Sequence, residues 1–119
     1  MANKEKNFAS AVIYVHNAEN RIEEFLKTII DTMESNFEHS EIICINDASD
    51  DKSVEKIKNI SAVAHSTSVS VINMSYFHGL EMAMNAGMDM AIGDFVFEFD
   101  NTILDFDAKV IMEIYRHSL

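Results

Sequence analysis

The chain has 119 residues, and its 20 acidic side chains outnumber its 9 basic ones, so the formal net charge is −11 at pH 7 with histidine neutral. This length suits one domain, and 48% hydrophobic residues supply a core without disulfides or a structural metal. The acidic balance argues against nucleic acid and against anionic membrane surfaces as partners, because both are bound through clustered lysine and arginine.

Cys44 is the only cysteine, which predicts no internal disulfide and favours a reducing compartment. The apolar stretch at residues 8–15 is too short for a membrane span, which needs roughly 20 apolar residues, and we interpret it as a first strand. We therefore expect a cytoplasmic chain with no membrane span, which in a full-length form would lie at the cytoplasmic face of the membrane.

Short apolar runs rich in β-branched or aromatic residues alternate along the chain with helical patterns. We expect strands over residues 11–15, 42–45, 69–74 and 95–99. Between the first two strands, apolar residues at alternating spacings of three and one predict a helix with one buried face, formed by Ile22, Phe25, Leu26, Ile29, Ile30 and Met33.

Three further helices follow from the same reasoning. The first runs over about 52–60, capped by Asp50 or Asp51. The next, over about 78–91, carries a stripe of small residues at four-residue spacing and methionines that we assign to core filling: Gly79, Ala83 and Gly87, with Met82, Met84, Met88 and Met90. The last begins at Asp105 or Asp107, with inward residues Val110, Ile111, Ile114 and Tyr115.

This alternation of strands and helices predicts an α/β fold, a three-layer α/β/α arrangement around a mainly parallel sheet. In such sheets ligands bind beyond the carboxyl ends of the strands. Polar residues stand at those ends, and Asn17, Asp50 and Asp51 are also suited to helix capping. Asp47 and Asp100 differ, because each directly ends an apolar strand and needs a partner there.

Three segments of the sequence resemble the nucleotide-binding half of family 2 glycosyltransferases, which have the GT-A fold. They are AVIYVHNAENRIEEFL, EIICINDASDD and VINMSYFHGLEMAMNAGMDMAIGDFVFEFDNT, and the match covers about residues 8–107. In that family the first strand ends in a Pro-Val-Tyr-Asn-Glu-like motif, the second in Asp-Asp-Gly-Ser and the fourth in Asp-x-Asp. The resemblance implies that residues 1–119 form one Rossmann-like domain, the donor-binding half of a longer glycosyltransferase.

The resemblance also implies roles for single residues. Asn17 and Glu19 would lie near the nucleoside, and Asp47 would accept the imide N–H of a uracil-like base. Gly79 would begin the helix beside the nucleotide, and Asp100 would face the ribose and a metal ion. The implied ligand is UDP-sugar or another nucleotide-sugar donor, with Mg²⁺ or Mn²⁺ offsetting the charge of the diphosphate.

Several positions depart from the family pattern. Thr102 stands where the family has the second aspartate of Asp-x-Asp, and a neutral hydroxyl is a poor replacement for a charged metal ligand. Tyr76 and Phe77 replace an Arg-Asn pair seen in many relatives. The part of the family that supplies the acceptor site and the catalytic base has no counterpart among these residues, so we identify no catalytic residue.

Three functions from different classes remain open at this point. The first, which we favour, is transfer of a sugar to an unknown acceptor in cell-surface polysaccharide or glycolipid synthesis. The second is a non-catalytic or truncated nucleotide-sugar-binding module. The third is a receiver-like signalling domain, although the first strand does not end in an acidic pair. We further expect an exposed apolar sheet edge to make the chain a homodimer at least.

Overall fold

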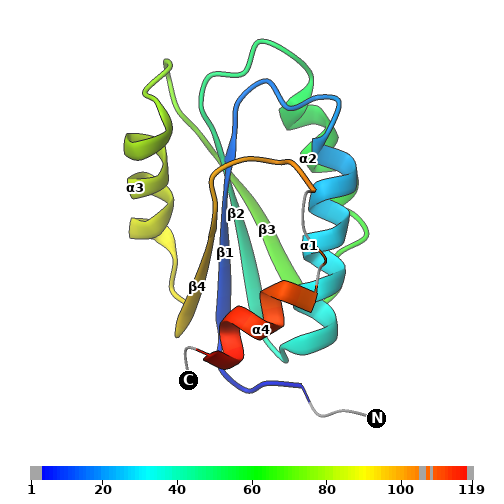
Figure 1. Cartoon of the computed structure of the whole chain (residues 1–119). Coiled ribbons are helices and arrows are strands. Elements are labelled where there is room, and N and C mark those ends of the chain that lie inside the picture. Colours follow the sequence, from blue (N-terminus) through cyan, green and yellow to red (C-terminus); the bar gives the residue numbers. More distant parts are fainter. Residues whose placement is uncertain (1–3, 105–106, 108, 118–119) are drawn as a thin grey trace.

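The structure, a computed structural model, describes residues 4–104, 107 and 109–117. Strands and helices alternate along the chain, as the sequence predicts (Figure 1). The elements are β1 (Ala9–Val15), α1 (Ile22–Asn36), β2 (Ser40–Asn46), α2 (Ser53–Ser61), β3 (Thr67–Asn73), α3 (Leu80–Met90), β4 (Phe95–Phe99) and α4 (Lys109–His117).

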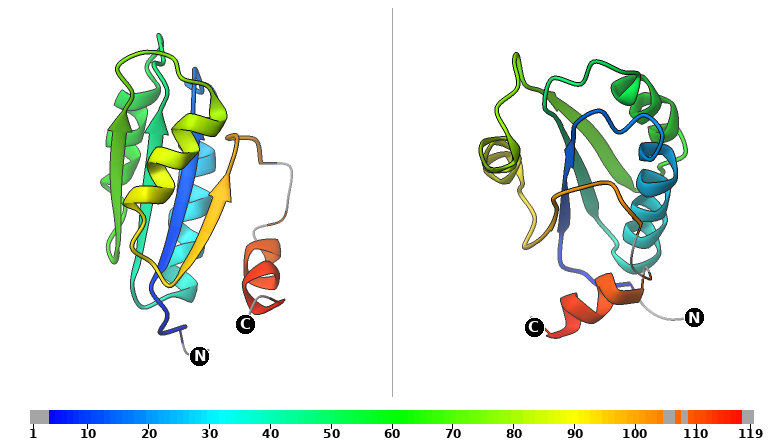
Figure 2. Two further views of the ribbon diagram at one scale, coloured as in Figure 1. Left: turned by 90° about the vertical axis from the view of Figure 1, so that its left-hand side faces the viewer. Right: turned by 45° about the horizontal axis from the view of Figure 1, so that its top comes forward.

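The four strands form one parallel sheet in the order β3-β2-β1-β4. Helices α1, α2 and α4 cover one face and α3 covers the other (Figures 1 and 2). The expected three-layer α/β/α architecture with a parallel sheet is therefore confirmed. Because all strands run the same way, the polar segments that follow them leave the sheet at a single edge.

The larger of two apolar clusters lies between the sheet and α1. All six residues of the predicted apolar face of α1 are at most 1% exposed. Phe37, just after α1, makes edge-to-face contacts with Phe97 of β4 and Tyr115 of α4, at ring-centroid distances of 6.2 and 5.0 Å. These aromatic contacts attach α4 to the same face as α1.

On the other face, α3 lies unusually close to the sheet. A Cβ on Gly87 would come within 2.5 Å of Cγ1 of Val12 and within 2.6 Å of Cδ1 of Ile45. The absence of a side chain at Gly87 therefore permits this approach, as the small-residue stripe predicts. The smaller apolar cluster, which includes Val12, Ile45 and Ala83, forms at this contact.

Some expected orientations are wrong. In α4 the buried residues are Ile111, Met112 and Tyr115, whereas Val110 and Ile114 are 36% and 52% exposed. Contact of Tyr115 with Phe37 and Phe95 rotates the helix so that the strip through residues 111, 112 and 115 faces inward.

Two methionines of α3 also differ from expectation. Met84 is buried, but Met82 and Met90 are each 60% exposed and do not fill the core. The reason is that α3 contacts the sheet along the narrow strip of Ala83, Met84 and Gly87.

Within the described part of the chain, no helix combines the length and the apolar character needed to cross a membrane.

Candidate functional site

The candidate site is the carboxyl edge of the sheet, where the loops after all four strands meet. Asp47 follows β2 and Asp100 follows β4, and β1 lies between these strands. Two strand spacings of about 4.8 Å put β2 and β4 roughly 10 Å apart, and Asp47 lies two residues farther along the sheet than Asp100, because Ile13 pairs with both Cys44 and Phe99. The parallel register therefore places both aspartates at one edge, on neighbouring parts of the same surface.

Asp47 is completely buried, and protein groups occupy both of its carboxylate oxygens. Oδ1 accepts the N–H of His78 at 2.8 Å. Oδ2 accepts the N–H of Gly79 at 2.9 Å and the hydroxyl of Tyr14 at 2.8 Å. Asp47 thus holds the turn before α3 against β1, and because its side chain is buried, a base imide N–H could reach it only if the surrounding loops moved.

These bonds also decide the charge state of Asp47. Burial alone would raise the pKa of this carboxyl, but the N–H of His78, the hydroxyl of Tyr14 and the N–H of Gly79 together lower the pKa below its usual value. The pKa of Tyr14, which donates to Asp47, shifts in the opposite direction. Burial, together with the neighbouring Asp47 carboxylate, raises the pKa of Tyr14 to about 12. Asp47 is therefore an anion and Tyr14 a neutral donor at physiological pH.

Asn17 and Glu19 connect the loop after β1 to the loop after β2. Asn17 accepts the N–H of Asp50 through Oδ1 at 2.8 Å, and Glu19 accepts the N–H of Lys52 through Oε1 at 3.2 Å. Asn17 is exposed and Glu19 half-buried, so both also reach the surface of the edge. Both side chains accept hydrogen bonds from backbone N–H groups of the loop after β2, which makes the two loops one hydrogen-bonded unit.

The expected helix caps need correction. Asn17 does not cap α1, whose N-cap position is Arg21, and the cap of α2 is Lys52 rather than Asp50 or Asp51. Asp51 nevertheless accepts the N–H of Ser53 one residue into α2, at 3.0 Å. Asp107 behaves as expected, because it accepts the N–H of Lys109 at the start of α4. Asp105 lies outside the described residues.

Three positions in these loops have a positive φ. Asn17 has φ 48°, Ala48 has φ 53° and Gly79 has φ 89°. Gly79 precedes the first residue of α3, and glycine adopts this conformation without steric cost. Ala48 stands where the family motif Asp-Asp-Gly-Ser has glycine, and a residue with a Cβ adopts this conformation at a cost of about 1 kcal/mol.

At the other end of the site, the chain after β4 offers few ligand groups. Asp100 is exposed, but Thr102 is 2% exposed and its Oγ1 accepts the Nε–H of Arg21 at 3.3 Å. Asn101 accepts the N–H of Ile103. Thr102 therefore points toward α1 and away from the surface that carries Asp100.

A divalent metal does not fit these residues well. Among the described residues, no three carboxylate, histidine or cysteine side chains are grouped so that they could hold a metal ion. At this edge the Asp-x-Asp-like segment supplies one exposed carboxylate, Asp100, because Thr102 is turned inward. Protein metal sites for Mg²⁺ or Mn²⁺ need several oxygen ligands. We therefore derive no step through a metal ion.

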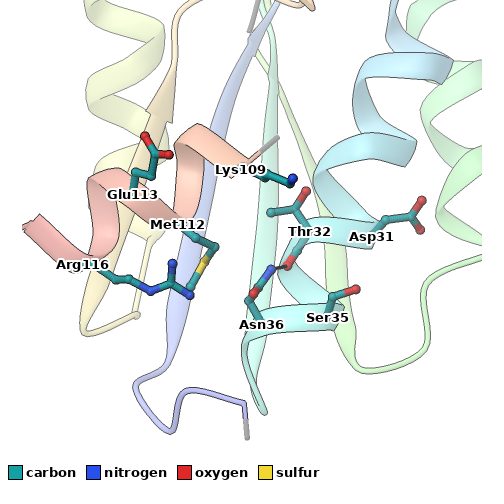
Figure 3. A pocket seen from close by; sticks show the side chains of 8 residues that line it. All are labelled: Asp31, Thr32, Ser35, Asn36, Lys109, Met112, Glu113 and Arg116. Carbon is teal, nitrogen blue, oxygen red and sulfur yellow. Dashed lines mark hydrogen bonds between the residues drawn. The ribbon is translucent and has the colours of Figure 1, made fainter. Parts of the chain in front are cut away.

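Two hollows lie at opposite ends of the molecule. A cleft of about 600 Å³ between α3 and β4 opens beside Asp100, and Glu81, Asn85 and Glu98 also line it. A second pocket, of about 420 Å³, lies between α1 and α4 near the amino ends of the strands (Figure 3). Its wall mixes Asp31 and Glu113 with Lys109 and Arg116. A further hollow of about 340 Å³, between β4 and α4, also reaches the carboxyl edge, where Asp100 and Asn101 line it.

Two residues that organise this edge are not among the site residues predicted from the sequence. Tyr14 binds Asp47, and His16 contacts the backbone oxygen of Asp47 through Nδ1 at 2.6 Å. A signal for Tyr14 was present, because its position two residues after Val12 puts both side chains on the α3 face of β1. His16 stands directly after the first predicted strand, at the edge where ligands are expected, but its contact with Asp47 depends on how the loop turns after β1.

The comparisons with known proteins agree with this geometry. The model of Glycosyl transferase family 2 matches residues 10–101, which include the loops after all four strands. The chain belongs to this family. An uncharacterized glycosyltransferase from Synechocystis, sll0501, is 30% identical over 81% of this chain, and YkcC from Bacillus subtilis is 31% identical over 88%. The family 2 domain described here spans about a third of the length of these relatives, 30% and 32% respectively.

Two further similarities are to a named transferase and to a solved structure. The undecaprenyl-phosphate 4-deoxy-4-formamido-L-arabinose transferase of Aeromonas hydrophila is 34% identical over 84% of this chain, which covers 30% of that protein. Among solved structures, a mannosyltransferase from Pyrobaculum calidifontis in complex with GDP-Man and Mn²⁺ superposes with a TM-score of 0.69 at 17% identity. The superposition covers 77% of this chain and 26% of that one. It confirms the GT-A fold.

Proposed function

We propose that this domain binds the nucleotide-sugar donor of a family 2 glycosyltransferase, and that the protein transfers the sugar to an acceptor used in cell-surface polysaccharide or glycolipid synthesis. The observation that carries the proposal is the convergence of four motif-bearing loops at one edge of a parallel sheet. This is where α/β sheets bind their ligands, because the strands end there and helix amino termini point toward the ligand.

Each predicted site residue has a place in this proposal. Asn17 and Glu19 fix the loop that would face the nucleoside, and Asp47 and Gly79 fix the turn before α3. Asp100 carries an exposed carboxylate toward which the ribose hydroxyls would be directed, since an anion accepts hydrogen bonds from hydroxyls. The structural relative holds GDP-Man with Mn²⁺. For this chain we propose a nucleotide sugar bound with little contribution from metal.

One observation favours a second candidate, a nucleotide-sugar-binding module that does not catalyse transfer. Three carboxylates line the cleft beside β4, namely Glu81, Glu98 and Asp100, while Thr102 is buried against Arg21. A diphosphate next to these carboxylates is repelled unless a cation offsets the charge. A protein with this site would bind the nucleoside part well and the diphosphate part poorly.

The binding proposal is tested by isothermal titration calorimetry with UDP-glucose and GDP-mannose, each with and without Mn²⁺. We expect measurable binding of at least one nucleotide sugar, weakened about five- to tenfold by Asp100→Asn through loss of charge-assisted hydrogen bonds. Asp89→Asn, an exposed carboxylate on α3, is the matched control and should leave the affinity unchanged. Absence of heat with every nucleotide sugar would contradict the proposal.

The receiver alternative has its own test. A phosphoacceptor aspartate must be reached by the phosphodonor, yet Asp47 is 0% exposed and bonded on both oxygens. We expect no phosphate on Asp47 after incubation with acetyl phosphate. Labelling at Asp47, detected by mass spectrometry, would favour the signalling function instead.

A cytoplasmic location and a homodimer are parts of the same proposal. Cys44 is buried as a free thiol, and burial raises its pKa to about 12, so it is protected from oxidation and fits a reducing compartment.

In the described sheet β4 is an edge strand, and edge strands pair readily with a further chain. Light scattering over a range of concentrations should show a species of twice the chain mass.

A further inference from the structure

The carboxyl edge carries four rings that we call the aromatic rim: His16, Tyr76, Phe77 and His78. Tyr76 and Phe77 are 66% and 58% exposed, although both are large side chains. The rings of His16 and Phe77 lie 4.8 Å apart, and those of Tyr76 and His78 stack at 4.1 Å with an interplanar angle of 23°. Two loops distant in sequence therefore present their rings side by side.

The backbone beneath these rings is fixed. Asp47 binds the N–H groups of His78 and Gly79, and Nδ1 of His78 contacts the backbone oxygen of Tyr76. On the other loop, His16 contacts the backbone oxygen of Asp47. The same buried carboxylate residue thus holds both halves of the aromatic rim, and the rings are presented on a preorganised support rather than on a loose loop.

The hydrogen bonds that the Asp47 carboxylate already makes within the protein affect how a base can be recognised here. Both of its oxygens are bonded within the protein, so the group that would read the imide edge of a base is not exposed. The exposed groups next to it are aromatic faces. Stacking on aromatic side chains holds any base, because every base has a π-face, whereas hydrogen bonds to a base edge distinguish one base from another.

We propose that Tyr76 and Phe77 hold the nucleobase of the donor by stacking, so that this site accepts several nucleobases instead of selecting one. The inference rests on the proposed function and goes beyond it by naming the residues that contact the base and the breadth of donors. A planar aromatic ligand is favoured over a membrane surface, because the net charge of −11 opposes anionic lipid.

The test compares the affinities of UDP, GDP, CDP and ADP by calorimetry for the wild type and three variants. We expect the four wild-type dissociation constants to lie within about tenfold of one another. Phe77→Ala and Tyr76→Ala should each weaken all four by about tenfold or more, which is the scale of one lost base-stacking contact. Met82→Ala, which removes an exposed side chain from α3, is the control and should change none of them.

The outcomes separate this inference from the function on which it rests. A wild type that binds UDP more than 100-fold better than GDP, with Phe77→Ala unchanged, would overturn the stacking role but leave donor binding intact. Failure of all four nucleotides and of the nucleotide sugars to bind would overturn both. Binding to vesicles of phosphatidylcholine and phosphatidylglycerol that Phe77→Ala abolishes would assign the aromatic rim to a membrane and would also contradict the proposal.

Discussion

The two ends of the carboxyl edge are built differently. At the end formed by the loops after β1, β2 and β3, Asp47 is buried and joins the loops through bonds to Tyr14, His78 and Gly79. At the end formed by the loop after β4, Asp100 is exposed and Thr102 is turned toward Arg21. In the proposed donor site the first would face the base and the second the ribose and the diphosphate, and we call them the nucleoside end and the diphosphate end.

The difference shows that the first end is a buried hydrogen-bonded framework, while the second presents the single exposed carboxylate of Asp100 beside the inward-facing Thr102. Buried, fully bonded carboxylates are structural, because their removal leaves unpaired donors in the interior. An exposed carboxylate with one weak partner contributes little to stability and is available to a ligand. Substitutions at the two ends should therefore affect different quantities, stability at the first and ligand binding at the second.

The largest effect is expected for Asp47→Asn. The variant puts an amide NH₂ where three donors now meet a carboxylate, and we expect a loss of about 2–4 kcal/mol in the free energy of unfolding. Urea denaturation followed by circular dichroism measures it. Asp50→Asn, an exposed neighbour in the same loop, is the control and should cost less than about 0.5 kcal/mol. Equal stability of the two variants would show that the nucleoside end is not held by Asp47.

The same carboxylate predicts a pH dependence. The pKa of Asp47 is lowered in the folded protein, so its contribution is complete above the unfolded value of about 3.9 and is lost as the pH falls through the folded value. The stability gap between the wild type and Asp47→Asn should therefore shrink as urea titrations are moved from pH 7 toward pH 3. A gap that stays constant over this range would mean that folding does not lower the pKa of Asp47.

A smaller effect, and a gain, is expected for Ala48→Gly. Ala48 has φ 53°, a conformation that costs a residue with a Cβ about 1 kcal/mol. Part of this gain is offset by the greater backbone freedom of glycine in the unfolded chain, so we expect stabilisation of up to about 1 kcal/mol by urea denaturation. Ala86→Gly inside α3 should instead destabilise by a similar amount. Destabilisation by Ala48→Gly would argue against the left-handed turn.

The smallest effect is expected at the diphosphate end, for Thr102→Asp. Because the residue is buried and next to Arg21, the new carboxylate should pair with the guanidinium instead of joining Asp100. The ratio of nucleotide-sugar affinities with and without Mn²⁺ should then change by less than about twofold. A tenfold gain in Mn²⁺ dependence would show that residue 102 reaches the ligand, and Asn101→Asp, at a neighbouring exposed position, provides the comparison.

The sequence predicted the framework better than the site. Spacing alone located all four strands, the buried face of α1 and the close approach at Gly87, since each depends on a local periodicity or on a missing side chain. It did not show that Asp47 would be enclosed by His78 and Gly79, or that Thr102 would turn toward Arg21. Those contacts join residues 31, 32 and 81 positions apart in loops whose path no periodicity describes.

The most direct measurement of the central claim is a titration of the ¹⁵N-labelled chain with UDP and GDP followed by amide chemical shifts. If the carboxyl edge is the donor site, the largest shifts will fall in residues 16–19, 47–49, 76–80 and 100–102, and residues around the pocket between α1 and α4 will not respond. Shifts centred on Asn36, Lys109 and Arg116 instead, or no shifts at millimolar nucleotide, would contradict the account.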